Sequence, residues 1–192
     1  MKVILASNSP RRKELLKLII ENFEVMPSDI NEILQDNLTP QEQVINLSYR
    51  KAKDIYKKTN GNRIIIGSDT IVVKDEKIYG KPKNKLNAKQ MIKDLLQQDK
   101  THKIITGLSV IIYVNGEYIE YKLFDEVKVY LKDILDEEID RWIETGKAMD
   151  KAAGYGIQNE FCVFIDKIEG NYTSAVGLPT HKLYDIIKEY IY

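Results

Sequence analysis

The sequence predicts an α/β protein with a mixed, strongly twisted sheet and flanking helices. Amphipathic helical segments alternate with β-branched runs along the 192 residues. Asn115-Gly116, a strong hairpin signal, joins two of the predicted strands, so part of the sheet must be antiparallel. The chain has neither of the common glycine loops for phosphate, Gly-x-Gly-x-x-Gly after a strand or Gly-x-x-x-x-Gly-Lys-Ser/Thr. We expect one domain over residues 1–192, with a division into two lobes as the alternative.

The first half of the chain carries clear helix and strand signals. Residues 1–6 are apolar enough for a short buried strand, and Ser9-Pro10 suits a helix start, with the helix ending near Asn22. Thr39-Pro-Gln-Glu42 forms a capping box, which predicts a helix to about Lys58. The β-branched run 64–73 predicts a strand interrupted at residues 67–70, and residues 78–79 begin a returning strand.

The second half follows the same logic. We expect Asn87 to cap a helix through about Gln98, and the Asn115-Gly116 turn to join two long strands. Alternating apolar residues in the second of these strands indicate one buried face and one wet face. The remaining predicted elements are strands at 102–114, 118–131 and 161–168, and helices at 136–145 and 181–192.

Charge and cysteine content argue against a protein that binds nucleic acid or membranes through its overall charge, and against one held together by internal disulfides. The chain has 29 basic and 29 acidic residues, so its whole-molecule field does not favour nucleic acid or membrane. Cys162 cannot form an internal disulfide, and its apolar neighbours predict a core position. A reducing, cytoplasmic setting fits, and we expect no signal peptide and no membrane-spanning run.

The stretch Ser7-Asn-Ser-Pro-Arg-Arg12 has an unusual charge for a helix start. Helix N-termini carry partial positive charge and normally prefer acidic residues, but here Arg11, Arg12 and Lys13 crowd the first turn. Free amide groups, serine hydroxyls such as that of Ser7 and two guanidinium groups would form an anion site, with phosphate as the expected anion. The alternative is an exposed basic turn on a surface helix.

Asp69 is the strongest catalytic candidate. It lies within an otherwise apolar strand, where a carboxylate is costly unless it is paired or bound to metal. Gly67 beside it suggests a bulge that directs the side chain toward a site, and we favour this over a solvated turn.

Two lysines and two further polar residues extend this candidate site. Lys51 falls in the middle of the buried face of the 39–58 helix, so it either snorkels or reaches a ligand. Lys81, held by the following proline, belongs at the same end of the sheet or in a plain surface turn. Glu32 could supply a metal oxygen from its loop, or could simply be solvated. Gln158 follows a glycine-containing loop and could read a base edge.

Taken together, these stretches resemble the Maf family of nucleotide pyrophosphatases. Asp150–Gln158 and Gly177-Leu-Pro179 belong to the match, which spans nearly the whole chain in the family's order. Its other parts are Ser7–Arg12, the Glu32 loop, Leu47–Ala52, Gly67–Thr70, Gly80–Pro82 and Thr106-Gly107.

The resemblance implies an enzyme that hydrolyses nucleoside triphosphates to monophosphate and pyrophosphate. It also implies a fold like the inosine triphosphatases, with a cleft between two lobes, and a homodimer. Thr70 after the aspartate is similar to the branch acting on dTTP and UTP, with modified pyrimidine triphosphates as further candidates. A 7-methyl-GTP pyrophosphatase and a non-catalytic nucleotide-binding regulator of cell division are the alternatives.

The resemblance also assigns roles to residues. Asp69 would be the proton acceptor. Arg11, Thr70 and Gln158 would determine substrate choice. The triphosphate would be held by Ser7, Arg11, Arg12, Lys51 and Lys81. Glu32 and Asp69 would bind a divalent cation, Mg²⁺ or Mn²⁺, for which oxygen ligands are suited.

Three departures from the family pattern are visible. Asn8 replaces a small residue, and Asn31 stands where the family often has aspartate beside the glutamate. The loop before Gln158 reads Lys151-Ala-Ala-Gly-Tyr-Gly156, which shifts the small residues relative to the family. The second departure bears on the metal role of Glu32, and the third on the placement of Gln158.

Overall fold

The computed structural model of the protein describes residues 1–191. Its backbone contacts divide the chain into two compact units. Unit 1 comprises Met1–Thr70, Thr106–Asp125 and Thr173–Tyr192, and unit 2 comprises Ile71–Ile105 and Glu126–Tyr172. Three long strands, β3, β5 and β6, contribute residues to both units.

The strands form one mixed sheet, as predicted. The pairing order is β2-β1-β3-β5-β6-β7, with β4 paired to β3. Strand β1 is parallel to both β2 and β3, whereas β4 is antiparallel to β3 and β7 is antiparallel to β6. The strands are β1 (Lys2–Leu5), β2 (Glu24–Val25), β3 (Arg63–Lys74), β4 (Lys77–Tyr79), β5 (Thr101–Val114), β6 (Glu117–Leu131) and β7 (Ile165–Glu169).

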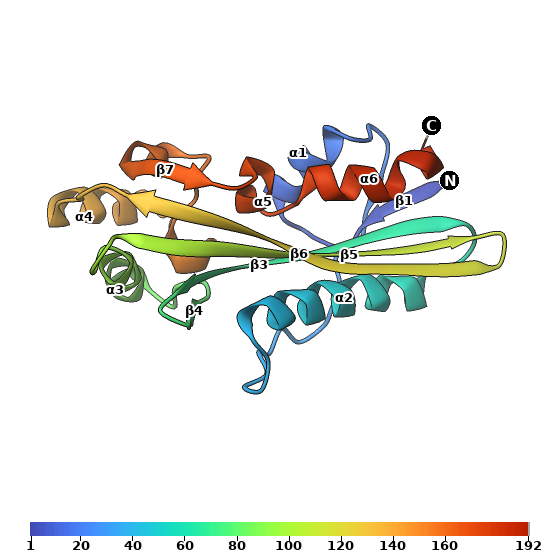
Figure 1. Ribbon diagram of the computed structural model, residues 1–192, viewed down its shortest axis with the longest axis horizontal. Helices are drawn as coiled ribbons and strands as arrows, with labels where there is room; N and C mark the ends of the chain where they lie inside the picture. The colour runs from blue at the N-terminus through green and yellow to red at the C-terminus, as the bar shows by residue number, and fades with distance from the viewer. Residues whose placement is uncertain (192) are drawn as a thin grey trace. The chain divides into compact units, whose positions relative to one another are not determined.

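The helices flank this sheet. The α-helices are α1 (Pro10–Lys17), α2 (Pro40–Lys58), α3 (Lys85–Leu95), α4 (Asp136–Glu144), α5 (Tyr172–Val176) and α6 (Thr180–Ile191). Two short 3₁₀ segments, η1 (Ala152–Gly154) and η2 (Glu160–Phe164), precede β7. In unit 1, α1 and α6 lie on one side of the strands and α2 on the other (Figure 1).

The core of unit 1 has two layers because successive strand residues point to opposite faces. On the α1 and α6 side, Val3, Leu5 and Ile64 pack with Leu16 and Leu183. On the α2 side, the alternate strand residues, including Ile4 and Ile65, pack with Ala52 and Ile55. A strand buried on both faces has a continuous apolar sequence, which explains the run before Asp69.

Two glycines allow α2 to lie close to the sheet. A Cβ on Gly67 of β3 would lie 2.2 Å from the Ser48 carbonyl oxygen, and one on Gly107 of β5 would lie 2.1 Å from that of Val44. No side chain larger than hydrogen fits at such a separation. Strand β3 continues without interruption through residues 67–70, so the predicted break in the strand is wrong. Gly67 is required by helix packing.

Unit 2 contains an aromatic core. The rings of Trp142 and Tyr155 both contact Phe161, with centroid separations of 5.5 and 4.8 Å. The Trp142 indole N–H donates to the Gly154 carbonyl oxygen at 2.8 Å, and His102 hydrogen-bonds the Tyr155 hydroxyl. These contacts tie α4, η1 and β5 together.

Two predicted helix boundaries need correction. Helix α1 ends at Lys17 rather than near Asn22, because the next residues form a tighter turn with a bond between residues three apart. In this turn Ile19 N–H donates to the Leu16 carbonyl oxygen at 2.9 Å. Helix α3 is capped by Asn84, whose side chain accepts from Asn87 N–H at 2.8 Å. The Asn87 side-chain oxygen in turn accepts from Lys83 N–H at 3.1 Å, so the predicted cap lies inside the first turn of the helix.

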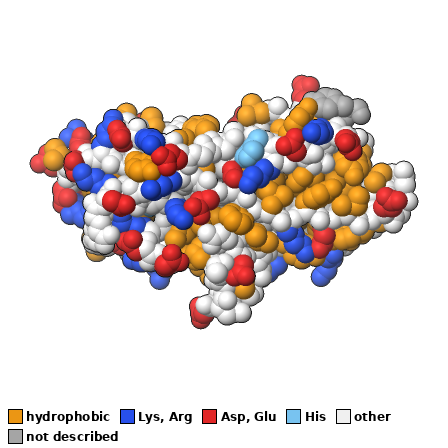
Figure 2. Space-filling model, viewed as in Figure 1, with side chains coloured by type: hydrophobic (Ala, Val, Ile, Leu, Met, Phe, Trp, Pro, Cys, Tyr) orange, Lys and Arg blue, Asp and Glu red, His pale blue; other side chains and the backbone are white. Residues whose placement is uncertain are grey.

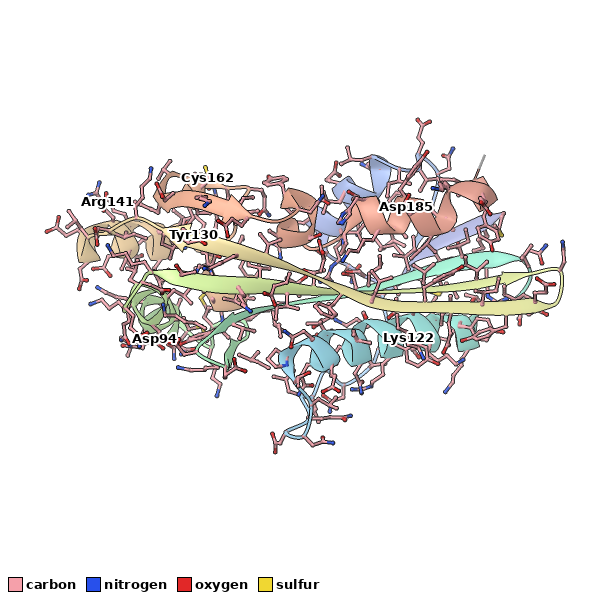
Figure 3. All side chains as sticks on the ribbon, viewed as in Figure 1. Asp94, Lys122, Tyr130, Arg141, Cys162 and Asp185 are labelled. Carbon is pink, nitrogen blue, oxygen red and sulfur yellow. The ribbon has the colours of Figure 1, made fainter. Side chains whose placement is uncertain are left out.

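The predicted strand at 161–168 is partly wrong. Residues 160–164 form η2, and only Ile165–Glu169 is strand. The Asn159 side chain accepts from Phe161 N–H at 3.3 Å, which starts the 3₁₀ turn and directs Phe161 into the aromatic core. Cys162 is consequently exposed, against the prediction of a core position (Figure 3).

Candidate active site

Asp69 and Lys51 form a buried ion pair in unit 1. The exposed fractions of these residues are 7% and 5%, and Lys51 Nζ lies 2.6 Å from Asp69 Oδ1. Lys51 Nζ also lies 3.0 Å from Oε1 of Glu32, whose side chain is exposed. Both carboxylates therefore converge on one ammonium group, which offsets the cost of burying Asp69.

The packing of α2 explains how Lys51 reaches this position. Ser48 and Ala52, on either side of Lys51, are the residues that contact Gly67 of β3. Lys51 is thus on the face of α2 that packs against β3. The point of contact, Gly67, is two residues from Asp69 along the strand. The structure excludes one of the two interpretations from the sequence: Lys51 is buried and does not snorkel to solvent. That Lys51 reaches a ligand stays a prediction.

Arg12 is fixed by three acceptors. Its Nε donates to the Gly177 carbonyl oxygen at 2.8 Å, Nη2 donates to Thr70 Oγ1 at 3.1 Å, and Nη1 donates to Ser7 Oγ at 3.3 Å. A guanidinium has five N–H groups, so these bonds leave donor capacity on both terminal nitrogens. The Arg12 guanidinium is therefore held in place by other residues of unit 1.

The electrostatics around Arg12 suit an anionic ligand. Burial lowers the pKa of the Arg12 guanidinium, the charges of Asp69 and Glu32 oppose this effect, and Arg11 reinforces it. Arg11 lies beside Arg12 in the first turn of α1, so two like charges are close together. An incoming phosphate would relieve both the desolvation and the repulsion.

Hydroxyl groups behind Arg12 were not identified as site residues from the sequence. Thr106 Oγ1 lies 3.0 Å from Thr70 Oγ1 and donates to the Ser174 carbonyl oxygen at 2.8 Å. Ser68 Oγ lies 2.9 Å from the carbonyl oxygens of Gly107 and Gly177. Thr106, Gly107 and Gly177 entered the sequence analysis only as parts of a family pattern, because no local signal marks them.

Lys81 and Gln158 belong to unit 2, and both are exposed there. Their two segments touch: Ala153 N–H donates to the Gly80 carbonyl oxygen at 2.9 Å. A Cβ on Gly154 would lie 3.4 Å from Pro82 Cγ. Unit 2 therefore brings the Lys81 turn and the loop before Gln158 together. The other predicted site residues gather in unit 1: Ser7, Arg11, Arg12, Glu32, Lys51, Asp69 and Thr70.

The acidic residues fit a nucleotide-bound divalent cation. Among residues 1–191 no three histidine, cysteine or acidic side chains cluster as a self-contained metal site. Mg²⁺ bound with a nucleotide needs only one or two carboxylates, since phosphate oxygens and water complete its shell. Glu32 and Asp69 already share one cation, the Lys51 ammonium, so the donor set matches this requirement.

Comparison with known proteins identifies the family. Residues 2–190 match the family model described as Maf-like protein. The chain belongs to the Maf-like protein family. This confirms the resemblance inferred from the sequence. The match leaves only Met1 and the last two residues outside it.

Relatives that match over almost their whole length carry a functional name. A protein of Alkaliphilus metalliredigens named dTTP/UTP pyrophosphatase is 43% identical over 193 residues, covering 100% of this chain and 97% of the relative. A protein of the same name from Alkaliphilus oremlandii is 45% identical and covers 98% of this chain and 95% of the relative.

More distant similarity was found among solved structures. A HAM1 protein from Coxiella burnetii covers 98% of this chain and 99% of its own, at a TM-score of 0.48 and 12% identity. The Staphylococcus aureus Ham1 protein covers 69% of this chain and 73% of its own, at a TM-score of 0.44 and 15% identity.

Among residues 1–191, no helix is long and apolar enough to cross a membrane.

Proposed function

We propose that this protein is a nucleoside triphosphate pyrophosphatase that hydrolyses dTTP and UTP to the monophosphate and pyrophosphate. The observation that carries the proposal is the buried Asp69–Lys51 pair with Glu32 on the same ammonium group. A buried carboxylate with a lysine partner suits acid–base chemistry beside phosphate. The name of the full-length relatives supports the substrate and the reaction.

In the proposed mechanism, Asp69 orients a water molecule and accepts its proton. The water oxygen forms a bond to the α-phosphorus as the bond from that phosphorus to the bridging oxygen breaks. The electron pair leaves with pyrophosphate. Arg12, held by Gly177 and Thr70, stabilises the charge that develops on the leaving group. Lys51, which lies beside Asp69, binds phosphate oxygens of the nucleotide through its ammonium group.

Other residues complete the proposed binding set. Ser7, Arg11 and Lys81 bind phosphate oxygens, and Arg11, Thr70 and Gln158 determine the choice of base. Glu32 and Asp69 would hold Mg²⁺ or Mn²⁺, which supplies positive charge to the triphosphate oxygens. A homodimer in the cytoplasm is the proposed assembly and location, by resemblance to the family.

A pyrophosphate-release assay over a panel of nucleoside triphosphates tests the function. We expect dTTP and UTP to give the highest kcat/KM with Mg²⁺ or Mn²⁺. EDTA should abolish turnover, because without the cation the negative charges of the two carboxylates and the triphosphate repel each other. Preference for 7-methyl-GTP would assign the other branch. Nucleotide binding without pyrophosphate release from any substrate would favour the regulator.

The Asp69→Asn variant tests the proton acceptor. The amide keeps the shape of the side chain but cannot accept a proton, so we expect kcat to fall at least about a thousandfold while nucleotide binding persists. Asp99→Asn, at an exposed aspartate of unit 2, is the matched control and should retain normal turnover. Near-normal kcat in Asp69→Asn would overturn the assignment.

A further inference from the structure

Thr106 is a buried threonine on β5 to which the proposed mechanism gives no role. Its hydroxyl lies within hydrogen-bond distance of two oxygens, the Ser174 carbonyl at 2.8 Å and Thr70 Oγ1 at 3.0 Å. A carbonyl oxygen only accepts, so the single hydroxyl proton of Thr106 points at Ser174. Thr106 must therefore accept the hydrogen bond from Thr70.

This assignment determines the direction of the whole chain of bonds. The proton of Thr70 is used toward Thr106, so Thr70 presents a lone pair to Arg12 Nη2, 3.1 Å away. A guanidinium only donates, and the two requirements agree. The donors and acceptors run in one direction from Arg12 through Thr70 and Thr106 to the backbone of Ser174.

The segment around α5 also holds a second nitrogen of the same guanidinium. The Gly177 carbonyl oxygen accepts from Arg12 Nε at 2.8 Å. Gly177 has φ +129°, and a Cβ there would lie 3.6 Å from Arg12 Nε and 3.4 Å from Thr70 Oγ1. Ser174 is itself anchored, since its hydroxyl donates to Asp125. The contacts of Arg12 at Nε and at Nη2 thus both depend on carbonyls of one short segment.

We propose that Thr106 is a positioning residue, which sets the orientation of the Arg12 guanidinium by holding the Thr70 hydroxyl in the accepting direction. The proposal rests on the proposed function, in which Arg12 binds the phosphates. A planar fork aims its remaining N–H groups only if its edges are fixed. Thr106 touches no substrate in this role and acts through Thr70.

The first test compares three variants of β5. Thr106→Val keeps the shape and removes the hydroxyl, so we expect kcat/KM for dTTP to fall about tenfold, the size of one lost hydrogen bond. Thr106→Ser keeps the hydroxyl and should stay within about twofold of the unaltered protein. Ser109→Ala is the matched control: Ser109 is equally buried on β5, and its hydroxyl bonds Ser48 at 2.8 Å, away from Arg12. It should also stay within about twofold.

A double-mutant comparison separates positioning from general loss of structure. On an Arg12→Lys background, which lacks the fork, Thr106→Val should change kcat/KM by less than about twofold. An equal loss on both backgrounds, an equal loss in Ser109→Ala, or no loss in folded Thr106→Val would overturn the proposal. Should Thr106→Val not fold, Thr106→Cys replaces it, because a thiol is a weak donor and acceptor, and a loss of at least about threefold is expected.

Binding of inorganic pyrophosphate, measured by calorimetry, distinguishes this proposal from the function beneath it. If the unaltered protein binds pyrophosphate but hydrolyses no nucleotide, the proposed reaction fails on its own. The positioning role is then still tested, because Thr106→Val should raise the dissociation constant for pyrophosphate about tenfold. An unchanged dissociation constant would count against Thr106.

Discussion

At the scale of single residues, His102 shows how burial changes a titration. The side chain is buried in unit 2, bonded to the Tyr155 hydroxyl, and its Nδ1 has no partner within residues 1–191. The pKa of His102 is lowered from 6.5 to about 3: burial is the largest cause, the charge of Lys74 acts in the same direction, and the charge of Asp99 opposes both. His102 is therefore neutral in the folded protein over most of the pH range.

The lowered pKa of His102 predicts acid sensitivity. Between pH 6.5 and about 3 the unfolded chain binds a proton that the folded chain does not, so stability falls as the pH drops. The free energy of unfolding should decrease by up to about 1.4 kcal/mol per pH unit from this group. The free energy of unfolding, measured with urea at several pH values in this window, should depend less steeply on pH in His102→Gln than in the unaltered protein.

His181→Gln provides the comparison for this measurement. The side chain of His181 is 42% exposed, so His181→Gln removes an exposed histidine and leaves the buried His102 in place. The result for His181→Gln shows how removal of an exposed histidine changes this dependence on pH. Equal slopes for His102→Gln and the unaltered protein would contradict the buried, neutral state of His102.

At the scale of elements, the contact of α2 with β3 controls the candidate site. The helix carries Lys51 and the strand carries Asp69, and Gly67 sets their separation. Gly67→Ala should lower the free energy of unfolding by about 3 kcal/mol, because backbone rather than a flexible side chain blocks the added methyl group. Urea denaturation monitored by circular dichroism measures the loss.

Gly80→Ala is the matched control for the glycine prediction. A Cβ on Gly80 would meet nothing within 4 Å, so its stability should change by less than about 0.5 kcal/mol. If Gly67→Ala were as harmless as Gly80→Ala, the close approach of α2 to β3 would be wrong.

Local signals predicted several elements correctly because their causes are local. The Thr39–Glu42 capping box starts α2, and Thr39 N–H donates to the Glu42 side chain at 2.8 Å. Asn115-Gly116 joins β5 to β6, with positive φ at both residues. The strand predicted at residues 161–164 is wrong because the burial of Phe161 against Trp142 and Tyr155 outweighs the apolar pattern of this run.

At the scale of the whole molecule, balanced charge is the dominant property. The chain has 29 basic and 29 acidic residues, and both signs are interspersed on the face shown in Figure 2. Attraction of an anion must therefore come from the local cluster around Arg11 and Arg12. A local basic cluster is enough to bind a small phosphate ligand. A nucleic acid polymer needs an extended basic surface, so the balanced charge disfavours a polymer as the ligand.

We predict that the protein does not bind duplex DNA. Fluorescence anisotropy with a labelled 20-base-pair duplex should show no binding up to about 10 μM protein at about 0.15 M salt, because no extended field replaces the counterions of the polymer. A fluorescent nucleoside triphosphate serves as the positive control. Micromolar affinity for the duplex would contradict the prediction.

The sequence by itself determined the mixed α/β class, the main helices and several members of the candidate site. Asp69 and Lys51 were visible because each breaks an apolar pattern, and burying a charge requires a reason that local structure does not supply. The basic start of α1 was visible for a similar reason, since its charge opposes the helix dipole.

Only the tertiary structure decided how these groups are held. Thr106, Ser174 and Gly177 are ordinary residues in the sequence, and Arg12 bonds Gly177 across a separation of 165 residues. Hydrogen bonds depend on distance and direction between atoms, which a one-dimensional pattern does not contain. The direction of the bonds from Arg12 to Ser174 therefore emerges only when the α5 segment lies against β3 and β5.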